Sequence, residues 1–139
     1  MIEFDFLQFK IGAAYFVVAF AAACVFALAF KVLYQWVTPY KETELIRQGN
    51  VPAAVTLGGA MIGYCLALAS ALSHTTSLPE LAAWAILAGV IQVVAFTIVR
   101  MLFLKDVKAR IEAGELAPAV YLASINVAVG LINAASMTS

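Results

Sequence analysis

The chain has 139 residues, of which 65% are hydrophobic and only 12% are charged, and its formal net charge at pH 7 is +0. A soluble domain normally carries about a quarter charged residues, so this chain has too little polar surface for a water-soluble globule. The balanced charge also lacks the basic surface of a nucleic-acid-binding domain, and we expect no nucleic-acid partner.

Long runs without a charged residue divide the chain. They are Ile11–Phe30, Val51–Pro79, Leu81–Val99 and Leu116–Ser139. A transmembrane helix needs about 20 apolar residues, because about 30 Å of hydrocarbon is crossed at about 1.5 Å per residue. We therefore predict four transmembrane helices, at Ile11–Val37, Val51–Leu72, Leu81–Leu104 and Leu116–Met137.

The basic residues predict the orientation, since short cytoplasmic loops are enriched in Lys and Arg. Lys31 and Arg100 lie just inside their helices, near connectors that carry five further basic residues. These five form the predicted cytoplasmic basic face: Lys41, Arg47, Lys105, Lys108 and Arg110. Only Lys10 falls on the other side. Both termini and the connector at 73–80 are then predicted to be periplasmic.

Two segments of the chain contain a charged turn of similar sequence. IRQGNVPAAVTL begins at Ile46, and IEAGELAPAVYL begins at Ile111, 65 positions later. Each half then reads as helix, charged turn, helix, and two such units share one orientation. The predicted fold is an all-α, integral membrane four-helix bundle built from two parallel two-helix repeats, residues 1–72 and 73–139, in one compact unit. Chance similarity between apolar helices is the alternative.

Both turns have the residues of a helix end followed by a helix start. Gly49 and Gly114 suit a left-handed C-terminal cap, and Asn50 suits an N-cap. Pro52 and Pro118 fall in the first turn of the next helix, where a missing N–H costs least. We therefore predict short helical extensions ending at the two glycines.

The paired turns GNVPAAV and GELAPAV, together with the closing GLINAASMT at 130–138, resemble the YjfL-like family of small bacterial inner-membrane proteins. That family is catalogued as a domain of unknown function (class 350). The resemblance covers almost the whole chain and implies a four-helix protein of the bacterial inner membrane. Genes of this type often sit near those for membrane-remodelling coat proteins of the phage-shock kind, which implies an envelope-stress partner protein. It implies no activity or catalytic residue.

Small residues and amides within the spans are the candidate site residues. They are Gly59, Gly63, Gln92, Asn126, Gly130 and Asn133. Small residues let membrane helices approach closely, and amides hydrogen-bond between helices, so one interpretation is packing within the bundle or between copies. The other is that these residues line a pore.

Groups suited to catalysis are sparse. No Asp, Glu or His lies deep within a predicted span, which argues against proton-coupled transport. His74 is the only histidine, and a lone histidine makes neither a metal site nor a catalytic triad. We expect no enzyme activity, no catalytic residue, no metal and no cofactor.

These features favour a non-enzymatic, homo-oligomeric scaffold in envelope maintenance, whose basic turns bind membrane lipids or an envelope-stress protein. The alternative is a small oligomeric channel or facilitator for a neutral or weakly polar solute. The sequence identifies neither the solute nor the partner.

Overall fold

The structure, a computed structural model, describes residues 3–103 and 106–137. Its helices are α1 (Phe6–Val37), α2 (Glu42–Arg47), α3 (Val51–His74), α4 (Leu78–Phe103), α5 (Val107–Glu112) and α6 (Leu116–Ser136). The four long helices are apolar and long enough to cross a membrane. The predicted all-α membrane bundle of four spans is therefore confirmed.

Two helices begin earlier than predicted, each at a polar cap. α1 begins at Phe6 and not at Ile11, because the Asp5 carboxylate accepts hydrogen bonds from the backbone N–H groups of Leu7 and Gln8. α4 begins at Leu78, where the preceding Ser77 hydroxyl accepts from the Glu80 N–H at 3.3 Å. Apolar run length therefore located these spans but not their first residues.

The charged turns fold as predicted, into the short helices α2 and α5. Gly49 and Gly114 follow them with φ of 87° and 84°, the left-handed region that glycine adopts without a side-chain clash. The Asn50 side chain accepts from the Ala53 N–H at 2.8 Å and so caps α3. The predicted helix ends and N-cap are confirmed.

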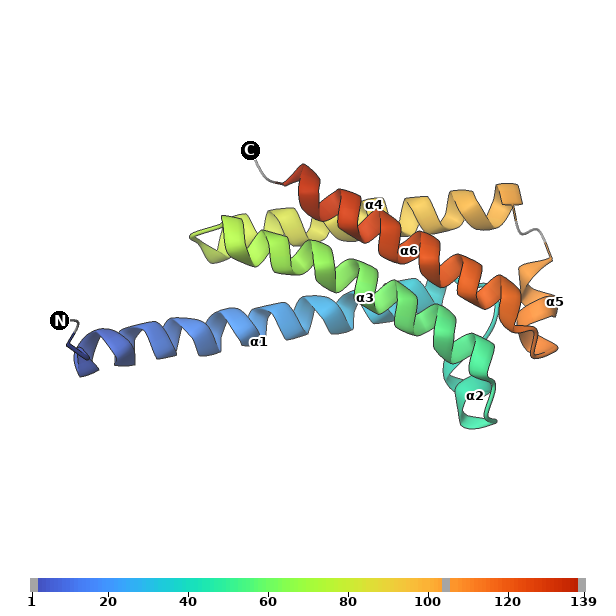
Figure 1. Ribbon diagram of the computed structural model, residues 1–139, viewed down its shortest axis with the longest axis horizontal. Helices are drawn as coiled ribbons and strands as arrows, with labels where there is room; N and C mark the ends of the chain where they lie inside the picture. The colour runs from blue at the N-terminus through green and yellow to red at the C-terminus, as the bar shows by residue number, and fades with distance from the viewer. Residues whose placement is uncertain (1–2, 104–105, 138–139) are drawn as a thin grey trace.

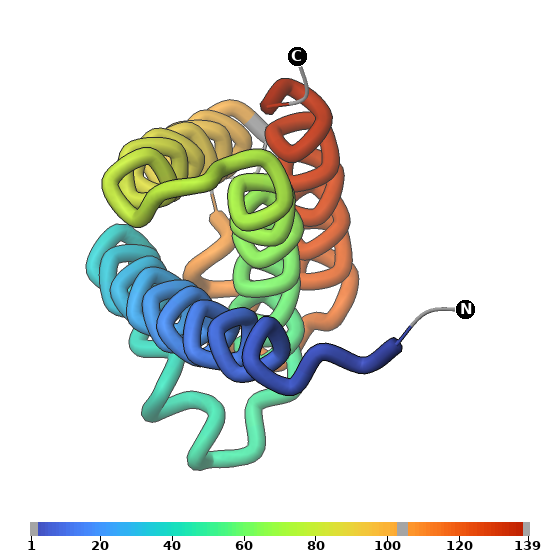
Figure 2. Tube along the Cα trace, turned by 90° about the vertical axis from the view of Figure 1, so that its left-hand side faces the viewer, coloured from blue at the N-terminus to red at the C-terminus, as the bar shows by residue number. Residues whose placement is uncertain are grey.

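The long helices form one bundle in which α3 and α6 pack along each other and α4 lies against both (Figure 2). α1 joins α3 and α4 through its C-terminal half, while its N-terminal half diverges from the bundle (Figure 1). All three buried α1 residues, Ala23, Phe30 and Tyr34, lie in the C-terminal half. Near the other end, the Tyr15 hydroxyl donates to the Thr76 carbonyl at 3.1 Å.

Aromatic rings fill the space where α1, α3 and α4 meet. Phe30 stacks on Tyr64 with ring centroids 4.3 Å apart, and Tyr34 contacts Phe96 at 4.8 Å. The Tyr64 hydroxyl donates to the Ala85 carbonyl in α4 at 2.9 Å, which satisfies its polar end within the bundle. These contacts hold α1 at the end of the molecule that carries α2.

The two halves correspond in their element bounds. α2 and α5 cover residues 42–47 and 107–112, an offset of 65, and α3 and α6 begin at residues 51 and 116, the same offset. The duplication itself stays a prediction.

Candidate functional site

The glycines of α3 and α6 lie where the two backbones touch. A Cβ added at Gly59 would lie 2.5 Å from the Ala123 Cα, and one at Gly63 would overlap the Asn126 carbonyl. A Cβ at Gly130 would overlap the backbone of Gly63. Since real Cβ atoms do not approach so closely, glycine is required for this α3–α6 contact.

The three amides predicted as packing or pore-lining residues lie between helices. Gln92 of α4 donates to the Asn126 carbonyl of α6 at 2.7 Å, and Asn133 of α6 donates to the Ala88 carbonyl of α4 at 3.1 Å. All three side chains are buried, and none of them lines the pockets described below. Within the described residues, Gln92 Oε1 and Asn126 Nδ2 lack a hydrogen-bond partner.

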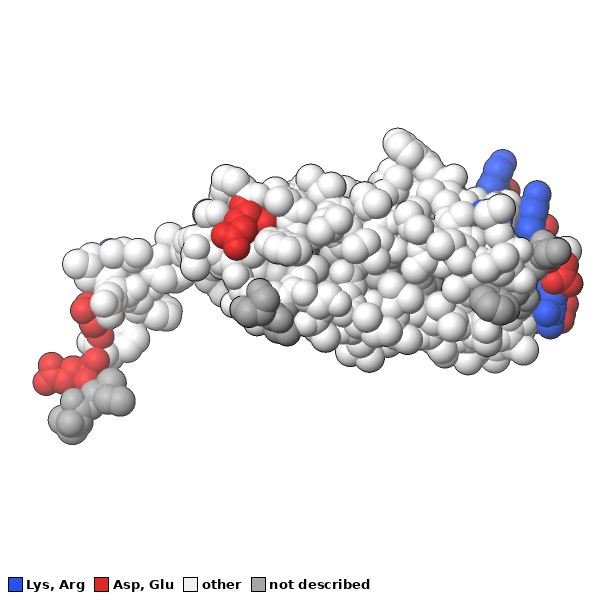
Figure 3. All heavy atoms as spheres, turned by 90° about the horizontal axis from the view of Figure 1, so that it is seen from above, with Lys and Arg blue, Asp and Glu red and all other residues white. Residues whose placement is uncertain are grey.

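Charged side chains gather at the end of the molecule formed by α2 and α5 (Figure 3). Lys41, Arg47, Lys108 and Arg110 of the predicted basic face belong to this end, whereas Lys105 lies outside the described residues. Arg110 pairs with Glu115 at 3.2 Å, the only ion pair among the residues described. Arg47 lines a shallow pocket of about 410 Å³ beside α2.

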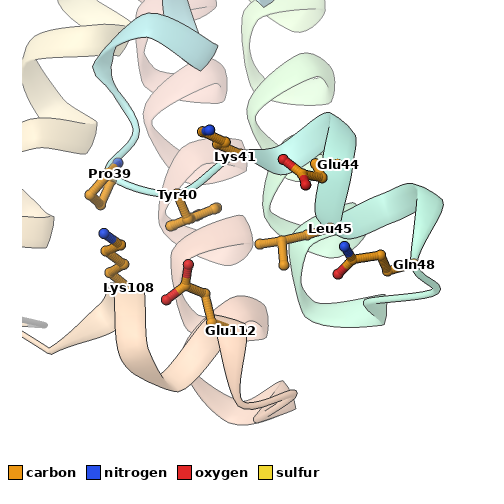
Figure 4. A pocket seen from close by; sticks show the side chains of 8 residues that line it. All are labelled: Pro39, Tyr40, Lys41, Glu44, Leu45, Gln48, Lys108 and Glu112. Atoms are coloured by element: carbon orange, nitrogen blue, oxygen red, sulfur yellow. The ribbon is translucent and has the colours of Figure 1, made fainter.

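A second pocket, of about 400 Å³, lies between α2 and α5 and brings residues of both halves together (Figure 4). We call it the turn pocket; its lining residues are Pro39, Tyr40, Lys41, Glu44, Leu45, Gln48, Lys108 and Glu112. Its two ammonium and two carboxylate groups form no ion pair within the described part of the chain. They remain available to a ligand that carries both signs of charge.

Asn50 holds the two walls of the turn pocket in place. In addition to capping α3, its amide nitrogen donates to the Ile111 carbonyl of α5 at 2.9 Å. One side chain therefore fixes the start of α3 and connects the first charged turn to the second.

A buried polar cluster lies next to the turn pocket, and sequence reasoning missed it. Glu42, the first residue of α2, is only 1% exposed, and neither carboxylate oxygen has a hydrogen-bond partner in the part of the chain described. The Tyr40 hydroxyl donates to the Thr56 hydroxyl at 3.1 Å, and Tyr34 is buried nearby. A signal existed in the sequence, since the 65-residue offset aligns Glu42 with the apolar Val107.

Burial controls the protonation of this cluster, because removal from water disfavours the charged form of an acid. It raises the pKa of Glu42 to about 8, against the opposing influence of Thr38 and Lys31. It also raises the pKa of Tyr40 to about 12. Burial therefore favours the protonated carboxylic acid form of Glu42.

Among the described residues, no three His, Cys, Asp or Glu side chains are grouped so that they could hold a metal ion. His74 hydrogen-bonds within its own helix, through the Ser70 carbonyl at 2.8 Å and the Ser70 hydroxyl at 3.5 Å. The described residues thus place two lysines and two glutamates around the turn pocket, with a buried carboxyl group at Glu42 beside it.

Comparison with known proteins gives the family. Residues 7–137 match the model for the Domain of Unknown Function (DUF350). The chain is 32% identical to the UPF0719 inner membrane protein YjfL of Escherichia coli (strain K12) over 125 residues, which cover 90% of this chain and 91% of that protein. It is 29% identical to the UPF0719 transmembrane protein YshE of Bacillus subtilis (strain 168) over 90 residues, 65% of this chain and 64% of that one. No solved structure matches the chain.

The family match spans nearly the whole chain, and the four apolar helices agree with the inner-membrane relatives. The resemblance seen in the paired turns and the C-terminal segment is thereby confirmed. The chain belongs to the DUF350 family and is a multi-pass inner-membrane protein.

Proposed function

We propose that this protein is a non-enzymatic scaffold of the inner membrane, which holds phospholipid headgroups at a charged platform formed by α2 and α5. The observation that carries the proposal is the turn pocket, where Lys41 and Lys108 from different halves line one cavity. Two carboxylates line it as well, so the favoured ligand has a phosphate for the lysines and an ammonium for the glutamates. A phosphatidylethanolamine headgroup has both groups.

The proposal includes the orientation of the protein in the membrane. The platform carries Lys41, Arg47, Lys108 and Arg110, whereas Lys10 is the sole basic residue near the opposite end of the molecule. The preference for cytoplasmic basic residues supports an inward-facing platform and periplasmic termini. Each basic residue near an anionic membrane surface contributes about 1 kcal/mol.

The buried amides support a scaffold over a channel. Gln92 and Asn133 use their amide nitrogens to bond backbone carbonyls of a neighbouring helix. Such bonds hold helices together, each contributing about 0.5–2 kcal/mol. A solute route along these residues would have to break those contacts.

Assembly into homo-oligomers also belongs to the proposal. An apolar groove of about 650 Å³ runs between α3 and α6, lined by residues such as Gly58, Ile62 and Leu131. In lipid, helices associate through close packing of this kind of surface, so the groove offers a second copy a place to pack.

Native mass spectrometry from nanodiscs tests the proposal, since bound lipid and copy number are read together. We expect phosphatidylethanolamine to remain bound in preference to phosphatidylglycerol, and the double variant Lys41→Ala/Lys108→Ala to lose it. Lys10→Ala, which removes a lysine from the opposite end, is the matched control and should retain the lipid. Equal lipid retention by all three proteins, or saturable solute flux in liposomes, would contradict the scaffold proposal.

A further inference from the structure

The Glu42 side chain is an ionisable group buried inside the protein. It is 1% exposed, and each carboxylate oxygen has less than 1 Å² of accessible surface and no hydrogen-bond partner among the described residues. An ionised carboxylate in such a place is strongly disfavoured unless it is paired. The group is therefore expected to carry a compensating positive species.

Packing does not require an acid at this position. Val107 is the first residue of α5, as Glu42 is the first residue of α2, and it is likewise 1% exposed. The second half of the chain thus fills the corresponding place with an apolar side chain. The carboxyl of Glu42 needs another explanation.

The charged and titratable groups around Glu42 come from several elements. Lys31 and Tyr34 belong to α1 and Tyr40 belongs to the connector before α2, while Arg100 of α4 interacts electrostatically with Tyr40. None of the described cations lies within 4.0 Å of the Glu42 carboxylate as an ion pair. Among the residues that the structure describes, the buried Arg100 Nε atom also has no hydrogen-bond partner.

The remaining space limits what can bind. Glu42 is among the residues that line the shallow pocket beside α2, but both of its carboxylate oxygens are shut off from solvent, so no hydrated cation or organic ligand reaches them without movement of α2. A proton requires no such space. We propose that Glu42 is a proton-binding site at neutral pH, and that loss of this proton at alkaline pH releases α2 from the bundle and so opens the turn pocket.

α2 can couple the Glu42 site to the turn pocket because its residues belong to both. Glu42 anchors its first turn in the bundle, while Glu44 and Leu45 of the same helix line the turn pocket. The raised pKa of Glu42, about 8, agrees with this site. A raised acid pKa means that the full stability is present below the unfolded value of 4.5 and is lost as pH rises through about 8. The inference does not depend on the lipid proposal.

An infrared titration of the full chain in nanodiscs, paired with hydrogen exchange, tests both parts. Between about pH 6 and about pH 10, we expect the protonated-carboxyl band to disappear with a midpoint near 8. Exchange of the α2 amides, residues 42–47, should rise several-fold over the same interval, beyond the intrinsic pH dependence. Glu42→Gln should abolish the band and the α2 response, whereas Glu80→Gln, which changes an exposed acid in the first turn of α4 outside the turn pocket, should keep both.

Glu42→Val, which copies Val107, is a second variant in case the glutamine variant fails to assemble, and it should also lack both responses. The absence of a protonated-carboxyl band at neutral pH, or a band that persists in either Glu42 variant, would overturn the proton site. A band that titrates without any added exchange in α2 would overturn the release of the helix.

Discussion

Gly63 shows how a single residue sets the distance between two helices. Its missing side chain leaves room for the Asn126 carbonyl of α6 and the Gln92 amide of α4. We predict that Gly63→Ala destabilises the protein by about 1–3 kcal/mol, because the added methyl group meets backbone that cannot rotate away. Thermal unfolding in a fixed detergent measures this effect.

Gly12 provides the control, since a Cβ built there meets nothing within 4 Å. Gly12→Ala replaces a helical glycine by a better helix former and should be neutral or stabilising by up to about 1 kcal/mol. Equal unfolding temperatures for the two variants would show that α3 and α6 do not approach as closely as described.

At the residue scale, the sequence identifies the residues at the helix contacts. It does not identify the atoms that these residues contact. Gly59, Gly63 and Gly130 were selected by spacing, and they lie at the α3–α6 contact. Glu42 was missed because a charged residue in a charged turn is expected to face water. Its burial depends on how α2 folds back on the bundle, a tertiary contact that no local pattern encodes.

Asn50 caps α3 and hydrogen-bonds to α5, and substitutions can separate these two roles. Asn50→Asp keeps an oxygen that caps α3 but removes the N–H donor to Ile111. Asn50→Ala removes both. We predict losses of about 0.5–1.5 kcal/mol for the aspartate variant, from the hydrogen bond, and about 1 kcal/mol more for alanine, from the cap.

Unfolding free energies of the three proteins, measured in the same detergent, check this order. If the aspartate variant were as stable as the parent chain, the bond from Asn50 to α5 would contribute nothing. If it were as unstable as the alanine variant, the cap would have no separate role.

Helix ends marked by glycine, asparagine or proline agree with the prediction, whereas α1 and α4 begin earlier than predicted because the caps Asp5 and Ser77 precede the apolar runs. Gly49 and Gly114 end their turns with positive φ, as their type predicts. The divergence of the N-terminal half of α1 has no such signal, because its apolar residues resemble those of a buried helix. Lipid, not protein, is expected to cover most of this segment.

At the scale of the whole molecule, most of the Lys and Arg side chains visible in Figure 3 gather at one end, acidic side chains lie toward both ends, and the surface between them is largely uncharged. This distribution suits a bilayer, because the four long helices are apolar enough to face hydrocarbon and the short helices α2 and α5 carry charged residues at one end. The central proposal is therefore a topological one: we propose that α2 and α5 are cytoplasmic and that the α3–α4 connector is periplasmic.

Cysteine accessibility in intact cells tests that claim directly. Cys24 and Cys65 are first replaced by alanine, and single cysteines are then introduced as Thr43→Cys in α2 and Ser77→Cys in the α3–α4 connector. With a membrane-impermeant maleimide, we predict that the Ser77→Cys protein is labelled in intact cells and that the Thr43→Cys protein is labelled only after the inner membrane is permeabilised. Labelling of Thr43→Cys in intact cells, with Ser77→Cys protected, would contradict the account.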